Sequence, residues 1–227
     1  MENNHKRDMP AELFTMSEQN TEFWIPPKSK EEYISDLTSS INAQEKIKII
    51  EMLIEIYRLD GIKKGGRYIE EGRDELIELM KKCLRGFSMK DSIARLALRE
   101  GGYCEKMGDY LSALKFYEAS LLYRVDDLKL HYFQLNNYGF CLNSLERFAD
   151  AEKILREAVG LIPQQYNAWK NLGVSLEHQG QYEEAAGCYL KAVLCSNKEP
   201  RLVAHLERLV ERYPSLIQIP TIAQWYA

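Results

Sequence analysis

The feature that most constrains how this chain folds is residues 166–199, which divide into two amphipathic halves around a glycine. Apolar positions in the first half follow the i, i+3, i+4 and i+7 spacing of one helix face: Trp169, Leu172, Gly173 and Leu176. The second half repeats that period at Tyr182, Ala185, Ala186, Tyr189, Ala192 and Val193. Because Gly180 separates the halves and glycine interrupts helices, the stretch predicts two helices joined by a turn.

Small residues in this stretch predict that the two helices cross closely. We expect Gly173 on the first helix to face Ala185 on the second, so that little side-chain bulk separates the backbones. Trp169 and Tyr189 are then expected to fill the volume on either side. A bulky residue at position 173 should therefore clash with the second helix.

The same pattern occurs one unit earlier in the chain. The matching residues lie 34 positions apart (173 minus 139 for the first pair), and the earlier set is Gly139, Leu142, Phe148, Ala151 and Ala158. A fixed period of this length is typical of proteins in which one supersecondary unit is repeated and stacked.

The motif pieces in these two copies resemble the tetratricopeptide repeat. They are Trp169-x2-Leu172-Gly173, Ala185-x3-Tyr189 and Ala158-x4-Pro163. The resemblance implies an all-α fold, in which helical hairpins stack into a right-handed superhelical solenoid. It also implies a protein that binds other proteins through the concave groove of that solenoid.

A third and weaker copy lies further back, at Gly101, Gly108, Tyr110, Ala113, Tyr117 and Ser120. Gly101 and Gly139 are 38 residues apart, so four extra residues, Leu128–His131, separate the first copy from the second. This insertion either lengthens a loop or adds a helical turn. The predicted repeats are therefore 94–127, 132–165 and 166–199.

The segments on either side of the repeats have different compositions. We expect a flexible arm at 1–28, N-terminal helices at 29–87, a capping helix at 200–213 and an apolar tail without helical period at 214–227. Within 29–87, Ser29 and Asn42 are expected to cap helix starts and Asp60-Gly61 to end the second helix. Helices at 42–59 and 67–85 form a candidate diverged repeat.

Composition restricts the classes of partner. The formal net charge is −4, with both signs interspersed, which gives nucleic acid no basic surface to bind. No run of about 18 apolar residues is present, and the first residues lack the apolar core of a secretory signal. Five cysteines without paired spacing favour reduced thiols. These features predict a cytoplasmic protein without a membrane span.

Residues suited to catalysis or metal binding do not gather in the sequence. The four histidines stand at 5, 131, 178 and 205, far from any metal-ligand spacing. No nucleophile with a matching base is recognisable. The sequence therefore predicts no enzyme, no cofactor and no metal.

What remains is a surface on the first helix of each repeat, beside the stripe assigned to the core. Stacked in register, these stripes are expected to line the concave groove and to hold a peptide or helix of a partner. The predicted groove residues are Arg95, Leu98 and Lys106 in the first repeat, Phe133, Asn136, Phe140 and Asn143 in the second, and Asn167, Lys170, Val174 and His178 in the third. The alternative is that Phe133 and Phe140 pack against an adjacent helix.

Two further hypotheses compete with a general binding scaffold. One is a cytosolic chaperone for a single client, because small acidic three-repeat chaperones of secreted proteins have a similar plan. The other is an autoinhibited module whose groove holds its own C-terminal tail or N-terminal arm. A carboxylate-gripping groove, which some members of the family possess, is not expected, because only Asn137 matches that set of residues.

Overall fold

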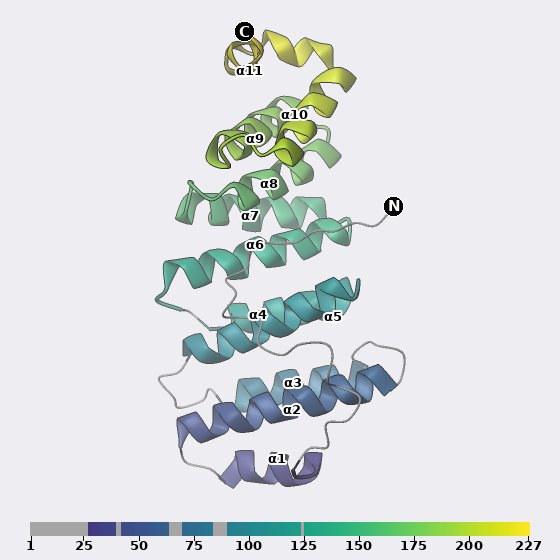
Figure 1. The fold of residues 1–227 in the computed structure, drawn as a ribbon, viewed down its shortest axis with the longest axis vertical. Helices are drawn as coiled ribbons and strands as arrows, with labels where there is room; N and C mark the ends of the chain where they lie inside the picture. Colours follow the sequence, from purple (N-terminus) through teal and green to yellow (C-terminus); the bar gives the residue numbers. More distant parts are fainter. Residues whose placement is uncertain (1–26, 40–41, 64–69, 84–89, 124) are drawn as a thin grey trace. The chain divides into compact units, whose positions relative to one another are not determined.

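The computed structural model describes residues 27–39, 42–63, 70–83, 90–123 and 125–227. Every regular element within these ranges is a helix, which confirms the all-α prediction (Figure 1). The chain divides into two compact units, Met1–Ile69 and Glu70–Ala227, and each is described by itself. Most of the predicted N-terminal arm lies outside the described residues.

The first unit contains α1 (Lys30–Ser39) and α2 (Ala43–Lys63), which pack against each other. Ser29 caps α1 as predicted: its Oγ accepts from the Glu32 N–H at 3.2 Å, and the Glu32 carboxylate accepts from the Ser29 N–H at 2.7 Å. Asn42 caps α2 by accepting from the Gln44 N–H at 2.9 Å.

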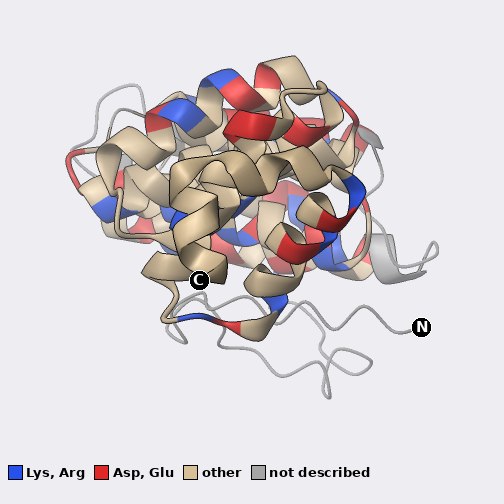
Figure 2. Ribbon diagram, turned by 90° about the horizontal axis from the view of Figure 1, so that it is seen from above, with Lys and Arg blue, Asp and Glu red and all other residues tan. Residues whose placement is uncertain are grey.

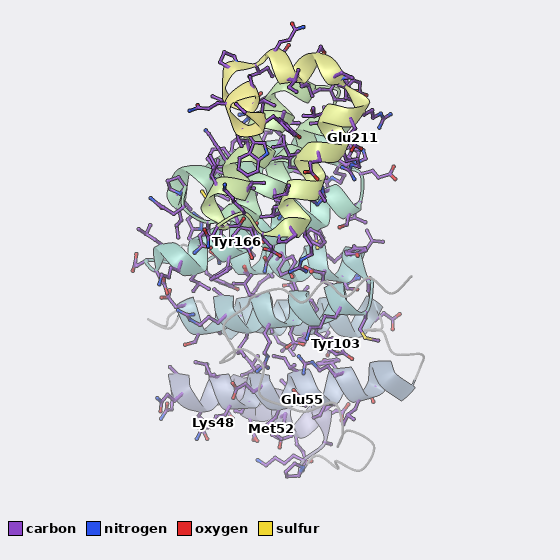
Figure 3. All side chains as sticks on the ribbon, turned by 45° about the horizontal axis from the view of Figure 1, so that its top comes forward. Lys48, Met52, Glu55, Tyr103, Tyr166 and Glu211 are labelled. Atoms are coloured by element: carbon purple, nitrogen blue, oxygen red, sulfur yellow. The ribbon has the colours of Figure 1, made fainter. Side chains whose placement is uncertain are left out.

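The predicted end of α2 at Asp60-Gly61 is wrong, because the helix continues to Lys63. A glycine inside a helix costs only about 1 kcal/mol relative to alanine, which a packed helix tolerates. Lys48, Met52 and Glu55 follow one another along this helix in Figure 3. Since α2 and α3 belong to different units, the hairpin expected from 42–59 and 67–85 stays a prediction.

The second unit holds three stacked helical hairpins, which follow α3 (Glu70–Cys83). Their helices are α4 (Lys90–Lys106) with α5 (Tyr110–Leu121), α6 (Leu128–Ser144) with α7 (Phe148–Leu161), and α8 (Tyr166–His178) with α9 (Tyr182–Cys195). In each pair the two helices pack on one another, and the second helix then packs on the first helix of the next pair (Figure 1). This hairpin stack is the solenoid expected from the repeats.

The four inserted residues, Leu128–His131, add a helical turn. They begin α6, which has 17 residues where α8 has 13. Asp127 caps the added turn by accepting from the Lys129 and Leu130 N–H groups at 2.9 and 3.2 Å. Its other carboxylate oxygen pairs with Arg95 Nη2 at 2.8 Å, which ties the insertion to the preceding repeat.

The close helix crossing is present, but its predicted partner is wrong. A Cβ placed on Gly173 would lie 2.6 Å from the Tyr189 ring, so the glycine makes room for Tyr189 rather than for Ala185. The crossings in the other repeats follow the same rule, with Gly101 against Tyr117 and Gly139 against Leu155. Each glycine thus lets the backbone lie directly on a large side chain sixteen residues further along.

The C-terminal segment closes the stack with three short elements. They are α10 (Pro200–Arg212), a 3-10 helix η2 (Pro214–Gln218) and α11 (Pro220–Tyr226). The tail, expected to lack helical period, therefore contains a helix, whose first residue is a proline as the first turn permits. Leu216 and Ile222 are buried, and Trp225 packs against a cluster of Ala192, Val193 and Leu202.

Candidate functional site

The first helices of the three hairpins form the inner layer of the stack. Among the described residues, α4 contacts α6 and α6 contacts α8, whereas α5, α7 and α9 have few or no contacts with one another. Helices on the concave side of a curved stack lie closer together than those on the convex side. We call the exposed surface of α4, α6 and α8 the inner face.

A network of buried amides joins α6 to α8 beneath the inner face. Asn171 Nδ2 donates to Asn136 Oδ1 at 3.0 Å, and Asn136 Nδ2 donates to Asn137 Oδ1 at 3.0 Å. Asn143 Nδ2 donates to the Asn171 carbonyl at 2.8 Å, while Ser175 Oγ donates to Asn143 Oδ1 at 2.8 Å. Because buried amides are costly unless bonded, these bonds hold the two repeats in register.

Three predicted groove residues are therefore core residues. Leu98 is 1% exposed, and Asn136 and Asn143 are 5% and 9% exposed, so their side chains do not line an open surface. The prediction that the two amides are available to a partner's backbone is wrong. The physical reason is that adjacent first helices pack on each other, which buries a stripe that a single isolated hairpin would leave open.

An aromatic and cationic cluster lies where the start of α5 meets the inner face. The rings of Phe140 and Tyr110 meet edge to face with centroids 6.2 Å apart, and Lys170 Nζ lies 6.0 Å from the Phe140 centroid. All three side chains are half-buried. We call them the Phe140 cluster. Val174, also half-buried, lies one helical turn beyond Lys170 on α8.

Phe133 lies nearer the start of α6 and is half-buried. Its ring meets that of Tyr132 edge to face with centroids 5.6 Å apart. Asn167, at the start of α8, is half-buried as well. Both phenylalanines thus have aromatic contacts within the protein and keep part of their surface open.

The remaining predicted residues lie toward the ends of the first helices. Arg95 is exposed and paired with Asp127, and Lys106 is exposed in the last turn of α4. His178 ends α8 and stacks on Phe148, with ring centroids 4.3 Å apart. The predicted residues that are not buried are therefore spread along the inner face, and among them only Phe140 and Lys170 meet in one cluster.

Acidic side chains beside the inner face are bonded within the protein. Glu105 accepts from Tyr117 OH at 3.0 Å, and Glu177 accepts from Tyr189 OH at 2.7 Å and pairs with Arg208 Nη2 at 3.0 Å. Burial, and then the Glu177 carboxylate, raise the pKa of the Tyr189 hydroxyl. The Leu130 backbone N–H, with Arg95 beside it, holds the pKa of Asp127 below its usual range.

Tyr110, Asn171 and Ser175 are the residues that the sequence analysis missed. Tyr110 served only as a repeat position of the first copy, although its ring contacts Phe140 of the next one. Asn171 and Ser175 lie one helical turn apart on the same face of α8, and this spacing of two polar residues was the available signal.

Within the described ranges, no group of three or more His, Cys, Asp or Glu residues could hold a metal ion. No described helix is both long and apolar enough to cross a membrane. Charged residues of both signs alternate around the described helices, while the segment after Arg212 carries none (Figure 2).

Comparison with known proteins identifies the repeat. The family model described as tetratricopeptide repeat matches residues 166–198, which span α8, its turn and α9. Residues 166–198 are therefore similar to a tetratricopeptide repeat. Human tetratricopeptide repeat protein 7A is 30% identical over 102 residues, which cover 45% of this chain and 11% of that protein. Human tetratricopeptide repeat protein 7B is 30% identical over 100 residues, which cover 44% and 11%.

These tetratricopeptide relatives are much longer proteins, of which the matched region spans about a tenth. Among solved structures, MamA (residues 41 to the end) from Desulfovibrio magneticus RS-1 matches with a TM-score of 0.51 and 19% identity. The match covers 78% of this chain and 90% of that one, and a MamA RS-1 double mutant matches equally well. The likeness shows a shared fold.

Proposed function

We propose that the inner face binds an extended or helical segment of another protein, without catalysis. The Phe140 cluster is the observation that carries this proposal, because it sets an aromatic surface and a cation side by side, all half-exposed, at the junction of three repeats. Partly exposed aromatic residues beside a polar rim are typical anchors in protein interfaces.

The apolar side chains around the Phe140 cluster favour a partner with an apolar anchor residue. Phe133 and Val174 extend the apolar surface along α6 and α8. The buried amide network beneath fixes the spacing of these two helices. A rigid surface of this kind loses little conformational entropy on binding, so more of the contact energy appears as affinity.

The tail version of autoinhibition is not supported. Residues 214–227 pack against α9 and α10, with Leu216 3% exposed and Ile222 fully buried. They therefore cover the end of the stack instead of the inner face. The version that involves the N-terminal arm concerns residues outside the described ranges and stays a prediction.

A chaperone for one client is a narrower form of the same proposal. It predicts that a client retained by the inner face is insoluble when expressed alone and soluble when expressed together with this chain. A client that is equally soluble in both cases would exclude the chaperone hypothesis and would be consistent with a general binding scaffold.

The proposal is tested by comparing proteins captured from a lysate of the cells that express this chain. The bait variant Phe133→Ala/Phe140→Ala removes two inner-face rings, and the control Leu122→Ala/Ile217→Ala removes two side chains that are 62% and 45% exposed elsewhere. We expect one partner to be captured by wild type and control and lost from the inner-face variant, with equal helix content by circular dichroism. Capture that the inner-face variant leaves unchanged would contradict the proposal.

A further inference from the structure

A cavity of about 330 Å³ opens on the outer side of the stack, between the second helices α7 and α9. The outer part of α8 forms its floor, and its lining comprises Arg156, Val159, Trp169, Leu172, Glu184, Gly187, Cys188 and Lys191. Trp169 and Leu172 lie on α8, but none of the lining residues belongs to the Phe140 cluster. The cavity is therefore distinct from that cluster and lies between the second and third repeats.

Part of the cavity lining is apolar and held in place by contacts within the protein. Val159, Leu172 and Cys188 are buried, 8%, 1% and 5% exposed. The indole of Trp169 is fixed because its Nε1–H donates to the Pro163 carbonyl at 2.8 Å. This apolar part of the lining suits an aliphatic or aromatic group, and Arg156, Glu184 and Lys191 add charged groups.

Gly187 gives the cavity its depth. A Cβ on this residue would meet nothing within 4 Å, so no contact within the protein requires glycine at this point of α9. Glycine inside a helix is unfavourable relative to alanine, and it commonly marks the close approach of another group. One repeat earlier, the equivalent positions of Gly187 and Leu172 hold Lys153 and Tyr138 (187 and 172 minus 34).

Charges at the rim are unequally compensated. Arg156 is held by Glu152 at 2.9 Å and by Glu184 at 2.7 Å. Lys191 lies over the Trp169 ring, 4.3 Å from its centroid, and has no acidic partner among the described residues. A carboxylate that approaches from the α9 side would therefore meet an ammonium group whose position is already fixed by the indole.

We propose that this cavity is a second protein-binding site, which receives an apolar side chain of a partner with a carboxylate at the adjacent residue. The apolar group packs over Gly187 against Val159 and Trp169, and the carboxylate pairs with Lys191. The volume suits one aromatic side chain rather than a longer segment. This site shares no residue with the Phe140 cluster.

The test uses the capped dipeptide acetyl-Asp-Phe-amide as the probe and the Trp169 indole N–H signal in ¹⁵N NMR as the reporter. We expect a saturable shift of that signal in the wild type and in Phe140→Ala, with a dissociation constant of roughly millimolar size for so small a ligand. The analogue acetyl-Asn-Phe-amide and the variant Lys191→Met should each bind about twofold to fivefold more weakly. Acetyl-Asp-Ala-amide should not shift the signal.

Matched variants separate filling of the cavity from general effects on the helices. Gly187→Leu should abolish the shift, and Gly187→Ala, which adds one carbon in open space, should weaken it. Gly160→Leu is the control, because a Cβ there also meets nothing within 4 Å but Gly160 does not line the cavity. No shift in the wild type, or an unchanged shift in both Gly187 variants, would overturn the proposal. Equal affinity for the Asp and Asn probes would contradict the part of the proposal in which a carboxylate of the partner pairs with Lys191.

Discussion

One residue in the turn of each repeat has a left-handed backbone. Gly108 and Gly180 have φ of +74° and +77°, and the equivalent residue of the middle repeat is Glu146 with φ of +59°. An L-residue with a side chain is disfavoured in this region by about 1 kcal/mol. Glu146→Gly should therefore raise the free energy of unfolding by about 0.5 to 1 kcal/mol in urea denaturation. Gly180→Glu should lower the free energy of unfolding by a similar amount. A loss of stability in Glu146→Gly would contradict the backbone strain inferred at Glu146.

Two glycines of the third repeat are expected to respond in opposite ways to the same change. Gly173→Ala forces a Cβ to within 2.6 Å of the Tyr189 ring, and such overpacking should cost about 1 to 3 kcal/mol. Gly187→Ala adds a Cβ in open space and should gain about 0.5 to 1 kcal/mol from helix propensity. Thermal unfolding of both variants distinguishes them, and changes of the same sign would show that the helix crossing is misplaced.

Between the elements α6 and α8, the amide network should make a measurable contribution to stability. Asn136→Ala leaves Asn171 Nδ2 and Asn137 Oδ1 without this hydrogen-bond partner, and a buried group left unbonded costs about 1 to 3 kcal/mol. Asn167→Ala, at a half-buried position on α8, should change stability by less than about 0.5 kcal/mol. Equal urea midpoints for the two variants would mean that the network does not join the repeats.

The buried thiol of Cys188 on α9 should make the stability of the protein depend on pH in the alkaline range. Burial first, and Glu184 second, raise the pKa of Cys188 to about 12. Above about pH 8.5 the unfolded chain loses this proton while the folded chain keeps it. The free energy of unfolding should therefore fall as pH rises from 8.5 toward 12.

The contribution of Cys188 to this decline is measured by urea unfolding at pH 7, 8.5 and 10. Between pH 7 and pH 10, the free energy of unfolding of Cys188→Ala should fall by about 1 to 2 kcal/mol less than that of the wild type. The exposed Cys195→Ala is the control. An identical decline in wild type and Cys188→Ala would contradict the burial of the thiol.

Periodicity predicted the helices of the repeats but not what each helix face contacts. The spacing of Gly173 identified the crossing, whereas its partner Tyr189 depends on how far the two helices are rotated about their axes. The stripe containing Leu98, Asn136 and Asn143 was read as open because a single hairpin leaves it open. Only the packing of consecutive first helices, which is a property of the stack, buries it.

For the whole second unit, the C-terminal segment acts as the cap that an open stack needs. Its helix α11 was missed because a seven-residue element is too short to show a period, and because its burial arises from tertiary contacts. Ile222→Ala should lower the free energy of unfolding by about 2 to 4 kcal/mol, since this side chain is fully buried.

The control for the cap is Ile217→Ala, at a side chain that is 45% exposed, which should cost less than about 1 kcal/mol. Chemical denaturation monitored by circular dichroism compares the two variants. Neither should gain affinity for an inner-face partner, because the tail does not cover that face. Tighter binding of an inner-face partner by Ile222→Ala would support autoinhibition by the tail and contradict this account.

Binding by the inner face is best examined with a photo-crosslinker placed within the folded protein. Benzoylphenylalanine replaces Val174, half-buried on α8 beside the Phe140 cluster, or Lys153, exposed on the second helix α7. After irradiation in the cells that express the chain, we expect one discrete adduct from position 174, reduced several-fold by Phe133→Ala/Phe140→Ala, and none from position 153. An adduct from position 153 alone, or one from position 174 that the double substitution leaves unchanged, would contradict binding at the inner face.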